Sequence, residues 1–436
     1  MAYPSFSGLH RLTNSIAEYS RLQHEYGAKG VDAILRRAEK SLLQAQRQLR
    51  ALPVDRRLAA REPNNLAAIR ALRPRGPRSL WPCLDEKRYA SRLAGAMLGR
   101  FAGCTLGAPV EFWDVPGMEA WAEEIGVPFP PQDYWPEIPN RHHVRYQVSR
   151  CDAYTRDRMN GVPVDDDITY TQLGLLVVED YGPCFTTDDV GKAWLKYLPY
   201  ACTAEDVALK NLKKRMPAKQ AAGINNPYCE WIGADIRADP WGYMAPGLPE
   251  FAAGMAYRDA YISHRRQGIY GEMFFAAAIA AAFAVDDPVE ALAIGLTEIP
   301  RDCALAKAVR WALHMAPKIR NYKQARAAVD RNFAGMSGVH TINNACLTIW
   351  GLTIGGTDFT RVIGETVAMG MDNDCTAATA GSLCGAVAGR KGIPARWTRR
   401  FNNVSRSYLN GHKKFAISDL ERRFTKQAQR VFAHLS

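Results

Sequence analysis

The 436-residue sequence lacks the long apolar runs of a membrane protein and the cysteine spacing of a disulfide or zinc framework. Its most apolar window, residues 274–285, lies between Glu272 and Asp286 and is too short to cross a bilayer. The N-terminus has no apolar stretch of the signal-peptide kind. None of the ten cysteines forms a CxxC pair, and most have apolar neighbours, as buried free thiols do. We therefore expect a cytoplasmic protein with no membrane partner.

Strand-like alternation is also scarce, and no strict internal repeat occurs. A content of 47% hydrophobic and 23% charged residues leaves little room for extended disorder. Apolar residues recur instead at helical spacing, which predicts an all-α fold. The expected helices cover roughly 88–103, 168–180, 189–198, 250–263, 271–285, 302–315, 322–333, 341–354, 358–370 and 375–389. Residues 112–164 are rich in Pro, Trp and Tyr, and a long irregular segment of this kind is often functional.

The N-terminal region has a different character. Residues 10–50 carry an apolar helical stripe interrupted near Gly30, and an Arg/Pro-rich connector follows at 72–78. We predict a basic helical extension over 1–84 and a main domain over 85–436. An apolar helix face needs a surface to bury against, so we expect the extension to pack on the main domain rather than form a free nucleic-acid arm.

The net charge of +12 is unevenly distributed. Residues 1–92 hold 18 Lys/Arg against 8 Asp/Glu, and residues 390–436 hold 12 against 2. Residues 93–389 are acidic, with 26 Lys/Arg against 34 Asp/Glu. Basic ends can attract nucleic acid or phosphate, but solvated helix faces give the same pattern and are favoured here. A cation site in the middle of the chain would account for the acidic character of that region.

Two acidic clusters lie about 200 residues apart, each just before a predicted buried helix. They are Asp165, Asp166 and Asp167, and then Asp372 and Asp374. Hard cations such as Mg²⁺, Mn²⁺ and Ca²⁺ prefer carboxylate oxygens, so the pattern predicts a divided metal site. Because Asp also commonly caps helices, helix capping is the alternative.

Glycine recurs every four residues in two helices, at 95, 99, 103 and 107 and again at 381, 385 and 389. This spacing puts the glycines on one helix face, where a second backbone or a ligand can approach closely. Glu111 follows the first run, which makes it a candidate for the site. Further along, His264 ends a predicted helix and Tyr270 begins the next; a local cap and core packing are their simpler interpretations.

Five elements in order resemble the ADP-ribosylglycohydrolase family over about residues 88–430. They are the glycine helix ending at Glu111, the Asp trio at 165–167, the Trp-Gly-Tyr-Met-Ala-Pro run at 241–246, Ser263-His264, and the segment 370–381 containing Asp372-Asn373-Asp374. The resemblance implies a compact helical bundle with Mg²⁺ or Mn²⁺ at its centre. Residues 1–85 lie outside it.

The resemblance also implies the ligands, and this sequence departs from the family at two of them. Asp165 stands where the family has Thr, followed by Asp166 and Asp167 at the two Asp positions. Asp372 and Asp374 match the second pair, and Cys375 stands at a second Thr position. Thr376 can offer a hydroxyl one residue out of register. Since a thiol suits Mg²⁺ poorly, we expect one metal position to be altered, with one or two ions of Mg²⁺, Mn²⁺ or Ca²⁺ bound.

The activity implied is metal-assisted hydrolysis of a glycosidic bond to ADP-ribose. Glu111, Asp166 and Asp374 are the implied catalytic residues, with Glu111 acting as acid or base. The residues implied to contact the substrate are Gly103, Trp241, Gly242, Tyr243, His264, Tyr270 and Gly271.

Three functions stay open at this stage. The first is release of ADP-ribose from a protein, a nucleic acid or a small molecule. The second is glycoside cleavage of an NAD-derived or nucleotide-like metabolite. The third is a non-catalytic ADP-ribose-binding protein that kept the pocket.

Overall fold

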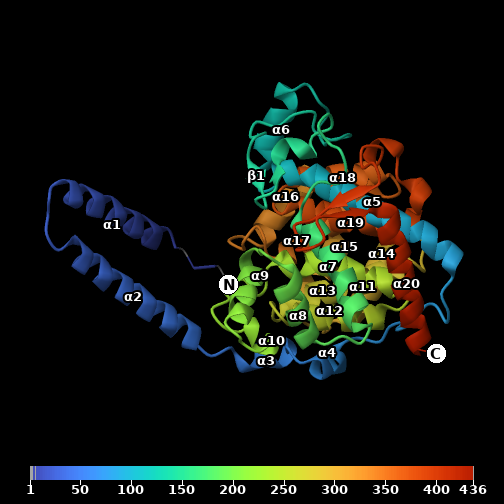
Figure 1. The fold of residues 1–436 in the computed structure, drawn as a ribbon, viewed down its shortest axis with the longest axis horizontal. Coiled ribbons are helices and arrows are strands. Elements are labelled where there is room, and N and C mark those ends of the chain that lie inside the picture. The colour runs from blue at the N-terminus through green and yellow to red at the C-terminus, as the bar shows by residue number, and fades with distance from the viewer. Residues whose placement is uncertain (1–2, 5, 436) are drawn as a thin grey trace. The chain divides into compact units, whose positions relative to one another are not determined.

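The computed structural model describes residues 3–4 and 6–435, and they form two compact units, Met1–Ala60 and Arg61–Ser436. The division between these units lies after Ala60, whereas the predicted main domain begins at residue 85. Helices dominate both units, which confirms the all-α prediction (Figure 1).

The first unit contains the predicted pair of helices, α1 (Ser7–Glu25) and α2 (Val31–Ala51). Gly30 separates them with φ of +91°, a conformation that favours glycine. Neither helix contains a buried residue, and Leu12, Tyr19 and Leu49 remain exposed. The expectation that this apolar stripe packs on the main domain stays a prediction for α1 and α2.

The second unit is a many-helix bundle. After α3 (Arg56–Arg61), which crosses the unit boundary, its helices are α4 (Leu66–Leu72), α5 (Glu86–Gly107), α6 (Val115–Glu124), α7 (Asp166–Tyr181), α8 (Thr187–Tyr197), α9 (Thr203–Lys213), α10 (Ala218–Ala221), α11 (Asp239–Met244), α12 (Pro249–Ala260), α13 (Gln267–Ala282), α14 (Pro288–Gly295), α15 (Ala304–Met315), α16 (Tyr322–Asn332), α17 (Thr341–Gly355), α18 (Phe359–Ala368), α19 (Asn373–Ala388) and α20 (Ile417–Leu435). Two antiparallel hairpins, β1 (Val144–Arg145) with β2 (Ser149–Arg150) and β3 (Val404–Arg406) with β4 (Lys414–Ala416), interrupt the helices.

Helix α13 forms the centre of the bundle. All of its residues are buried, and α11, α12, α14 and α17 pack around it (Figure 1). Its sequence is apolar on every side, as a helix enclosed by others requires. The alanines at 276–278 and 280–282 let these neighbours approach closely.

Helices α5 and α19 lie side by side, and the contact is between their backbones (Figure 1). A Cβ added at Gly99 would lie 2.1 Å from the Gly381 carbonyl oxygen, and one at Gly95 would lie 2.2 Å from that of Gly385. At Gly103 the added Cβ would meet the Ala377 carbonyl oxygen at 2.0 Å. The glycine spacing therefore sets an antiparallel register in which the end of α5 meets the start of α19.

Residues 61–84 are part of the bundle. The Glu298 side chain is 1% exposed and forms ion pairs with Arg73 at 2.5 Å and with Arg78 at 2.6 Å. Ile69 is fully buried, and the Tyr270 hydroxyl donates to the Pro63 carbonyl at 2.6 Å. The expected packing of the N-terminal region is thus confirmed for this segment.

Among the described residues, one segment, Glu86–Val110, is long and apolar enough by composition to cross a membrane. That window is entirely buried inside the bundle, which is the character of a core helix.

Gly99→Ala tests the α5–α19 contact. Because the new methyl has no space beside the Gly381 carbonyl, we expect a loss of about 3 kcal/mol or more of unfolding free energy, measured by urea denaturation. Gly254→Ala in α12 is the matched control, since an added Cβ there meets its nearest atom at 3.7 Å. The control should be neutral or stabilise by up to about 1 kcal/mol. Equal effects of the two substitutions would rule out backbone contact.

Deletion of residues 1–54 tests the independence of the first unit. Because residues 1–60 form a compact unit of their own, we expect the melting temperature of the bundle to stay unchanged. Deletion of residues 1–84 removes Arg73, Arg78 and Ile69 as well and should lower it strongly. Loss of stability with the shorter deletion would contradict this division.

Candidate metal and catalytic site

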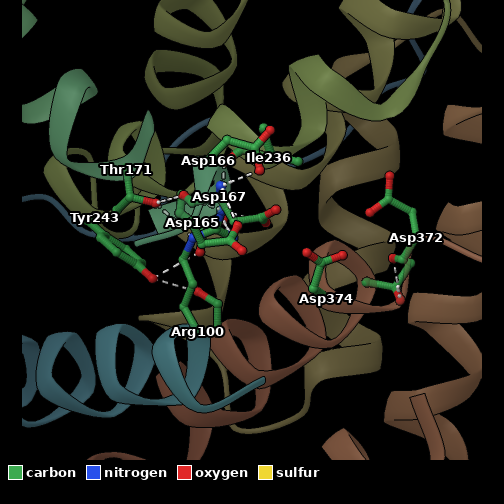
Figure 2. Close-up of polar contacts among 12 residues, drawn as sticks. Arg100, Asp165, Asp166, Asp167, Thr171, Ile236, Tyr243, Asp372 and Asp374 are labelled. Atoms are coloured by element: carbon green, nitrogen blue, oxygen red, sulfur yellow. Dashed lines mark hydrogen bonds and ion pairs between the residues drawn. The ribbon is translucent and has the colours of Figure 1, made fainter. Parts of the chain in front are cut away.

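The two acidic clusters meet where α7 and α19 begin, as Figure 2 shows. Carboxylate oxygens of Asp165, Asp167 and Asp374 lie within 4.8 Å of one another, together with the Cys104 thiol. Oxygens of Glu111 and Asp372 lie equally close to Asp374. The predicted convergence of clusters 200 residues apart is confirmed.

Helix capping explains only part of this arrangement. Asp165 caps α7, accepting a hydrogen bond from the Asp167 amide at 3.1 Å. Asp372 occupies the cap position of α19 but makes no side-chain capping bond. Capping therefore leaves Asp372, and with it Asp374, without a structural role.

The α5–α19 contact brings Glu111 to this point. Gly107 packs against the Cα of Asp374, and the chain continues through η1 (Ala108–Val110) to Glu111. Asn373 fastens the two segments, because its amide donates to the Val110 carbonyl at 3.3 Å and to the Val367 carbonyl at 3.1 Å.

Two residues with positive φ flank the acidic groups. Phe112, next to Glu111, has φ of +63°, and Met371, next to Asp372, has φ of +61°. The Phe112 amide donates to the Met371 carbonyl at 3.1 Å. Bulky residues rarely adopt this conformation, and such strain commonly persists at functional sites. The hydrogen bond holds the two acidic segments in register.

A cavity of about 430 Å³ opens over these groups. The acids on its wall are Glu111, Asp166, Asp167, Glu205, Asp372 and Asp374, and the aromatic residues are Phe112, Tyr146, Tyr170, Tyr200 and Trp231. Its size suits a small-molecule ligand or one portion of a larger one. Its lining thus combines carboxylates, which offer polar contacts, with aromatic rings, which offer stacking surfaces.

An arginine from the irregular segment reaches into the acidic cluster. The Arg145 guanidinium donates to Glu111 at 2.7 Å, to Asp165 at 3.0 Å and to Asp374 at 3.1 Å. The next residue, Tyr146, donates its hydroxyl to Asp166 at 2.7 Å. Together the two residues contact four acids, Glu111, Asp165, Asp166 and Asp374.

A second arginine neutralises the far side of the cluster. Arg100 of α5 is fully buried and pairs with Asp167 at 3.0 Å and with Asp239 at 2.7 Å (Figure 2). It also donates to the Thr171 hydroxyl at 2.7 Å and the Ile236 carbonyl at 2.6 Å. Arg100 thus links α5 to α7, and its role is structural.

Burial and mutual repulsion raise the pKa values of the clustered acids. Burial is the larger cause for Asp165, Asp167 and Asp372, and the charge of Asp374 adds to it in each case. Burial and Asp374 likewise raise the pKa of Glu111 to about 8, against the opposing effect of Arg145. These acids keep their charges at neutral pH only if more positive charge is supplied.

The residues present fit a divalent cation. Among the described residues, the ion pairs made by the six carboxylates come from Arg100 and Arg145. The six are Glu111, Asp165, Asp166, Asp167, Asp372 and Asp374. One oxygen of Asp374 is buried without a hydrogen-bond partner among the described residues. An orphaned buried carboxylate oxygen is costly unless a cation binds it, and an all-oxygen set suits Mg²⁺, Mn²⁺ or Ca²⁺.

Two of the predicted ligands take other positions. Cys375 is buried and does not line the cavity; the thiol beside the acids belongs to Cys104 of α5. The Thr376 hydroxyl donates to the Asp372 carbonyl of its own helix at 3.1 Å and lines no part of the cavity. Both predictions rested on sequence register, which does not show where a side chain points within the first turn of a helix.

None of the residues predicted to contact substrate lines this cavity. The Trp241 indole donates to Glu272 at 2.7 Å, and the Tyr243 hydroxyl donates to Asp239 at 2.9 Å, both in the core. Gly242 packs on Ile279, Gly271 on Asp235 and Gly103 on α19. His264 is fully buried beside Ser263, and the Tyr270 hydroxyl donates a hydrogen bond to the Pro63 carbonyl. Their observed contacts are core contacts.

The sequence did not identify the residues that form much of the wall. Arg145, Tyr146 and Trp231 belong to no predicted motif, although the first two lie in the irregular segment that was expected to be functional. Glu205 faces the cavity, and burial raises its pKa to about 7 while Arg237, 2.7 Å away, opposes the shift. No local pattern distinguishes Glu205 from a surface acid in the first turn of α9.

Comparisons with known proteins identify the family and the fold of this chain. The sequence model of the ADP-ribosylglycohydrolase family matches residues 85–430. A solved structure described as an ADP-ribosylglycohydrolase-related protein complex superposes with a TM-score of 0.51 at 19% identity, covering 80% of this chain and 99% of that one. Likeness at this identity concerns the fold. A comparison with curated proteins gives no match.

Asp374→Asn tests whether the cluster binds a cation. Wild-type protein should melt at a higher temperature with Mg²⁺ or Mn²⁺ than with chelator, by the equivalent of about 2.7 kcal/mol at a hundredfold excess over Kd. The substitution removes the acid shared by both groups and should abolish that difference. Asp188→Asn, at an exposed acid in α8, should retain it. A wild type indifferent to chelator would argue against a cation here.

Proposed function

The chain belongs to the ADP-ribosylglycohydrolase family, and we propose that it is a metal-dependent hydrolase that cleaves the glycosidic bond between ADP-ribose and an acceptor. The observation that carries this proposal is the meeting of Glu111, Asp372 and Asp374, whose oxygens lie within 4.8 Å at the wall of the cavity. Three acids from two separated segments would not be held together in a core for stability alone, because like charges repel.

The acids divide into two roles under this proposal. Asp166, Asp167, Asp372 and Asp374 would hold a divalent cation, which supplies positive charge to orient ribose hydroxyls and to lower the pKa of water. Glu111 is half-buried at the cavity wall, and one of its oxygens is paired with Arg145. Its other oxygen is available to exchange a proton with water or with the leaving group.

The raised pKa of Glu111 suits it for proton transfer. A carboxyl group with a pKa of about 8 is protonated at neutral pH and can donate. Positive charge bound nearby favours the carboxylate, which can instead accept a proton from water. The same side chain can thus serve as acid or base as the local charge changes.

The aromatic wall supports a nucleotide-like ligand. Tyr170, Tyr200 and Trp231 line the same cavity as the acids. Flat rings stack on adenine, while carboxylates and a cation select the ribose. We propose that ADP-ribose, free or attached to its acceptor, is the group that the cavity holds.

One observation favours a second candidate, a protein that binds ADP-ribose without cleaving it. Arg145 pairs with Glu111, Asp165 and Asp374 together, so the acids are partly neutralised without any ion. Release of ADP-ribose separates the two candidates, because a binder retains affinity for ADP-ribose and gives no product.

We also propose a reducing, cytoplasmic setting. All ten cysteines are free, and Cys104, Cys151, Cys303, Cys346, Cys375 and Cys384 are buried. Buried thiols that form no disulfide are typical of proteins from reducing compartments. A small molecule or a modified protein is the favoured acceptor; nucleic acid is a less favoured one.

Glu111→Gln tests the catalytic assignment. The amide keeps the shape but cannot transfer the proton, so release of ADP-ribose from model conjugates should fall by about 100-fold or more. Affinity for ADP-ribose, measured by calorimetry, should change little. Glu123→Gln, at an exposed acid of α6, is the control and should keep full activity. A fully active Glu111→Gln enzyme would remove Glu111 from the chemistry.

A further inference from the structure

Arg145 is held in position by its backbone. It pairs with Ser149 across the β1–β2 hairpin, and the Val148 amide donates to the Arg145 carbonyl at 3.1 Å. Tyr146 and Gln147 complete the tight turn with φ of +49° and +61°. A side chain carried by a closed hairpin has less freedom than one on an open loop.

The guanidinium of Arg145 is also held by its surroundings. Its side chain is 10% exposed and its charge lies near the rings of Tyr146 and Tyr154, at 5.2 and 5.4 Å. Besides the three acids, it donates to the Ala108 carbonyl at 2.6 Å and contacts the Tyr146 hydroxyl at 3.1 Å. These five contacts form a site for a positively charged group, and the Arg145 guanidinium fills it.

The position of Arg145 matters because the acids form two groups that share one member. Asp165, Asp167 and Asp374 belong to the first group, and Glu111, Asp372 and Asp374 to the second. Arg145 binds Asp165 from the first, Glu111 from the second, and the shared Asp374. It therefore bridges the two groups.

Arg145 and a second ion would compete for the same oxygens. A hard cation binds carboxylates at about 2.0–2.6 Å, and the arginine nitrogens already lie 2.7–3.1 Å from these three acids. Two positive centres sharing one set of oxygens repel each other strongly in a buried site. Either the arginine leaves or only one ion binds.

Enough oxygen atoms remain for one ion. The unpartnered Asp374 oxygen is buried, Asp372 makes no capping bond, and Asp166 and Asp167 each present an oxygen toward the same cavity. Of these four acids, Asp374 is the one that also pairs with Arg145, through its other oxygen. One divalent ion and two arginines would compensate much of the charge of the six acids.

We propose that Arg145 acts as a permanent internal cation in place of one metal ion, so that this chain binds a single divalent ion. The inference concerns the same acidic centre as the proposed function and rests on it. Arg145 then neutralises Glu111 and Asp165 at any pH at which the protein folds, because a guanidinium stays charged. Substituting Arg145 by a neutral side chain converts the centre into one that takes two ions.

Metal stoichiometry tests this proposal. Purified full-length protein is saturated with Mn²⁺, and bound metal is measured by elemental analysis and by calorimetry. We expect about one ion for wild type and for Arg145→Lys, and about two for Arg145→Met, where the freed oxygens accept another cation. Arg150→Met, on the same hairpin but exposed and paired only with His142 and Asp152, should bind one.

Two results would overturn the proposal. One is a wild type that binds two ions or none; the other is a folded Arg145→Met protein that still binds one. If Arg145→Met fails to fold, electron paramagnetic resonance of Mn²⁺-loaded wild type decides alone, because an isolated ion and a coupled pair give different spectra. Failure of the proposed function is distinguishable: one bound ion without release of ADP-ribose leaves the role of Arg145 intact and removes the hydrolase.

Discussion

An excess of buried negative charge is the constraint on which the rest of this structure depends. Asp165, Asp167 and Asp374 are each at most 2% exposed and lie within one small volume. Such an arrangement is unfavourable unless positive charge is brought to it. Arg100 and Arg145 supply part of that charge from two different parts of the chain. The remaining negative charge is the basis of the proposal that this centre binds a cation.

The scaffold positions these charges through its smallest residues. Glycines at spacings of four let α5 and α19 touch along their backbones, which leaves their register no freedom to slip. The ends of the two helices then bring Glu111 to Asp374. Strained backbone at Phe112 and Met371 completes the junction. Because α5 and α19 are in contact through glycines, acids that are distant in sequence are held in fixed positions.

Much of the fold was predictable, because periodic apolar residues determine helices locally. The meeting of Asp167 with Asp374 was also predictable, since several acids before buried helices have few other uses. Arg145 was not, because its importance comes from a hairpin that folds back over the site from an irregular segment. Trp241 was misplaced for a related reason: an aromatic residue within a motif is often a core residue.

The central claim is that this acidic centre holds one divalent cation beside a fixed arginine. A crystal structure of the Mn²⁺-loaded protein, with anomalous diffraction recorded at the manganese edge, tests it most directly. The account predicts one anomalous peak bounded by Asp166, Asp167, Asp372 and Asp374, with Arg145 still paired to Glu111. Two peaks with Arg145 displaced into solvent, or no peak at all, would contradict it.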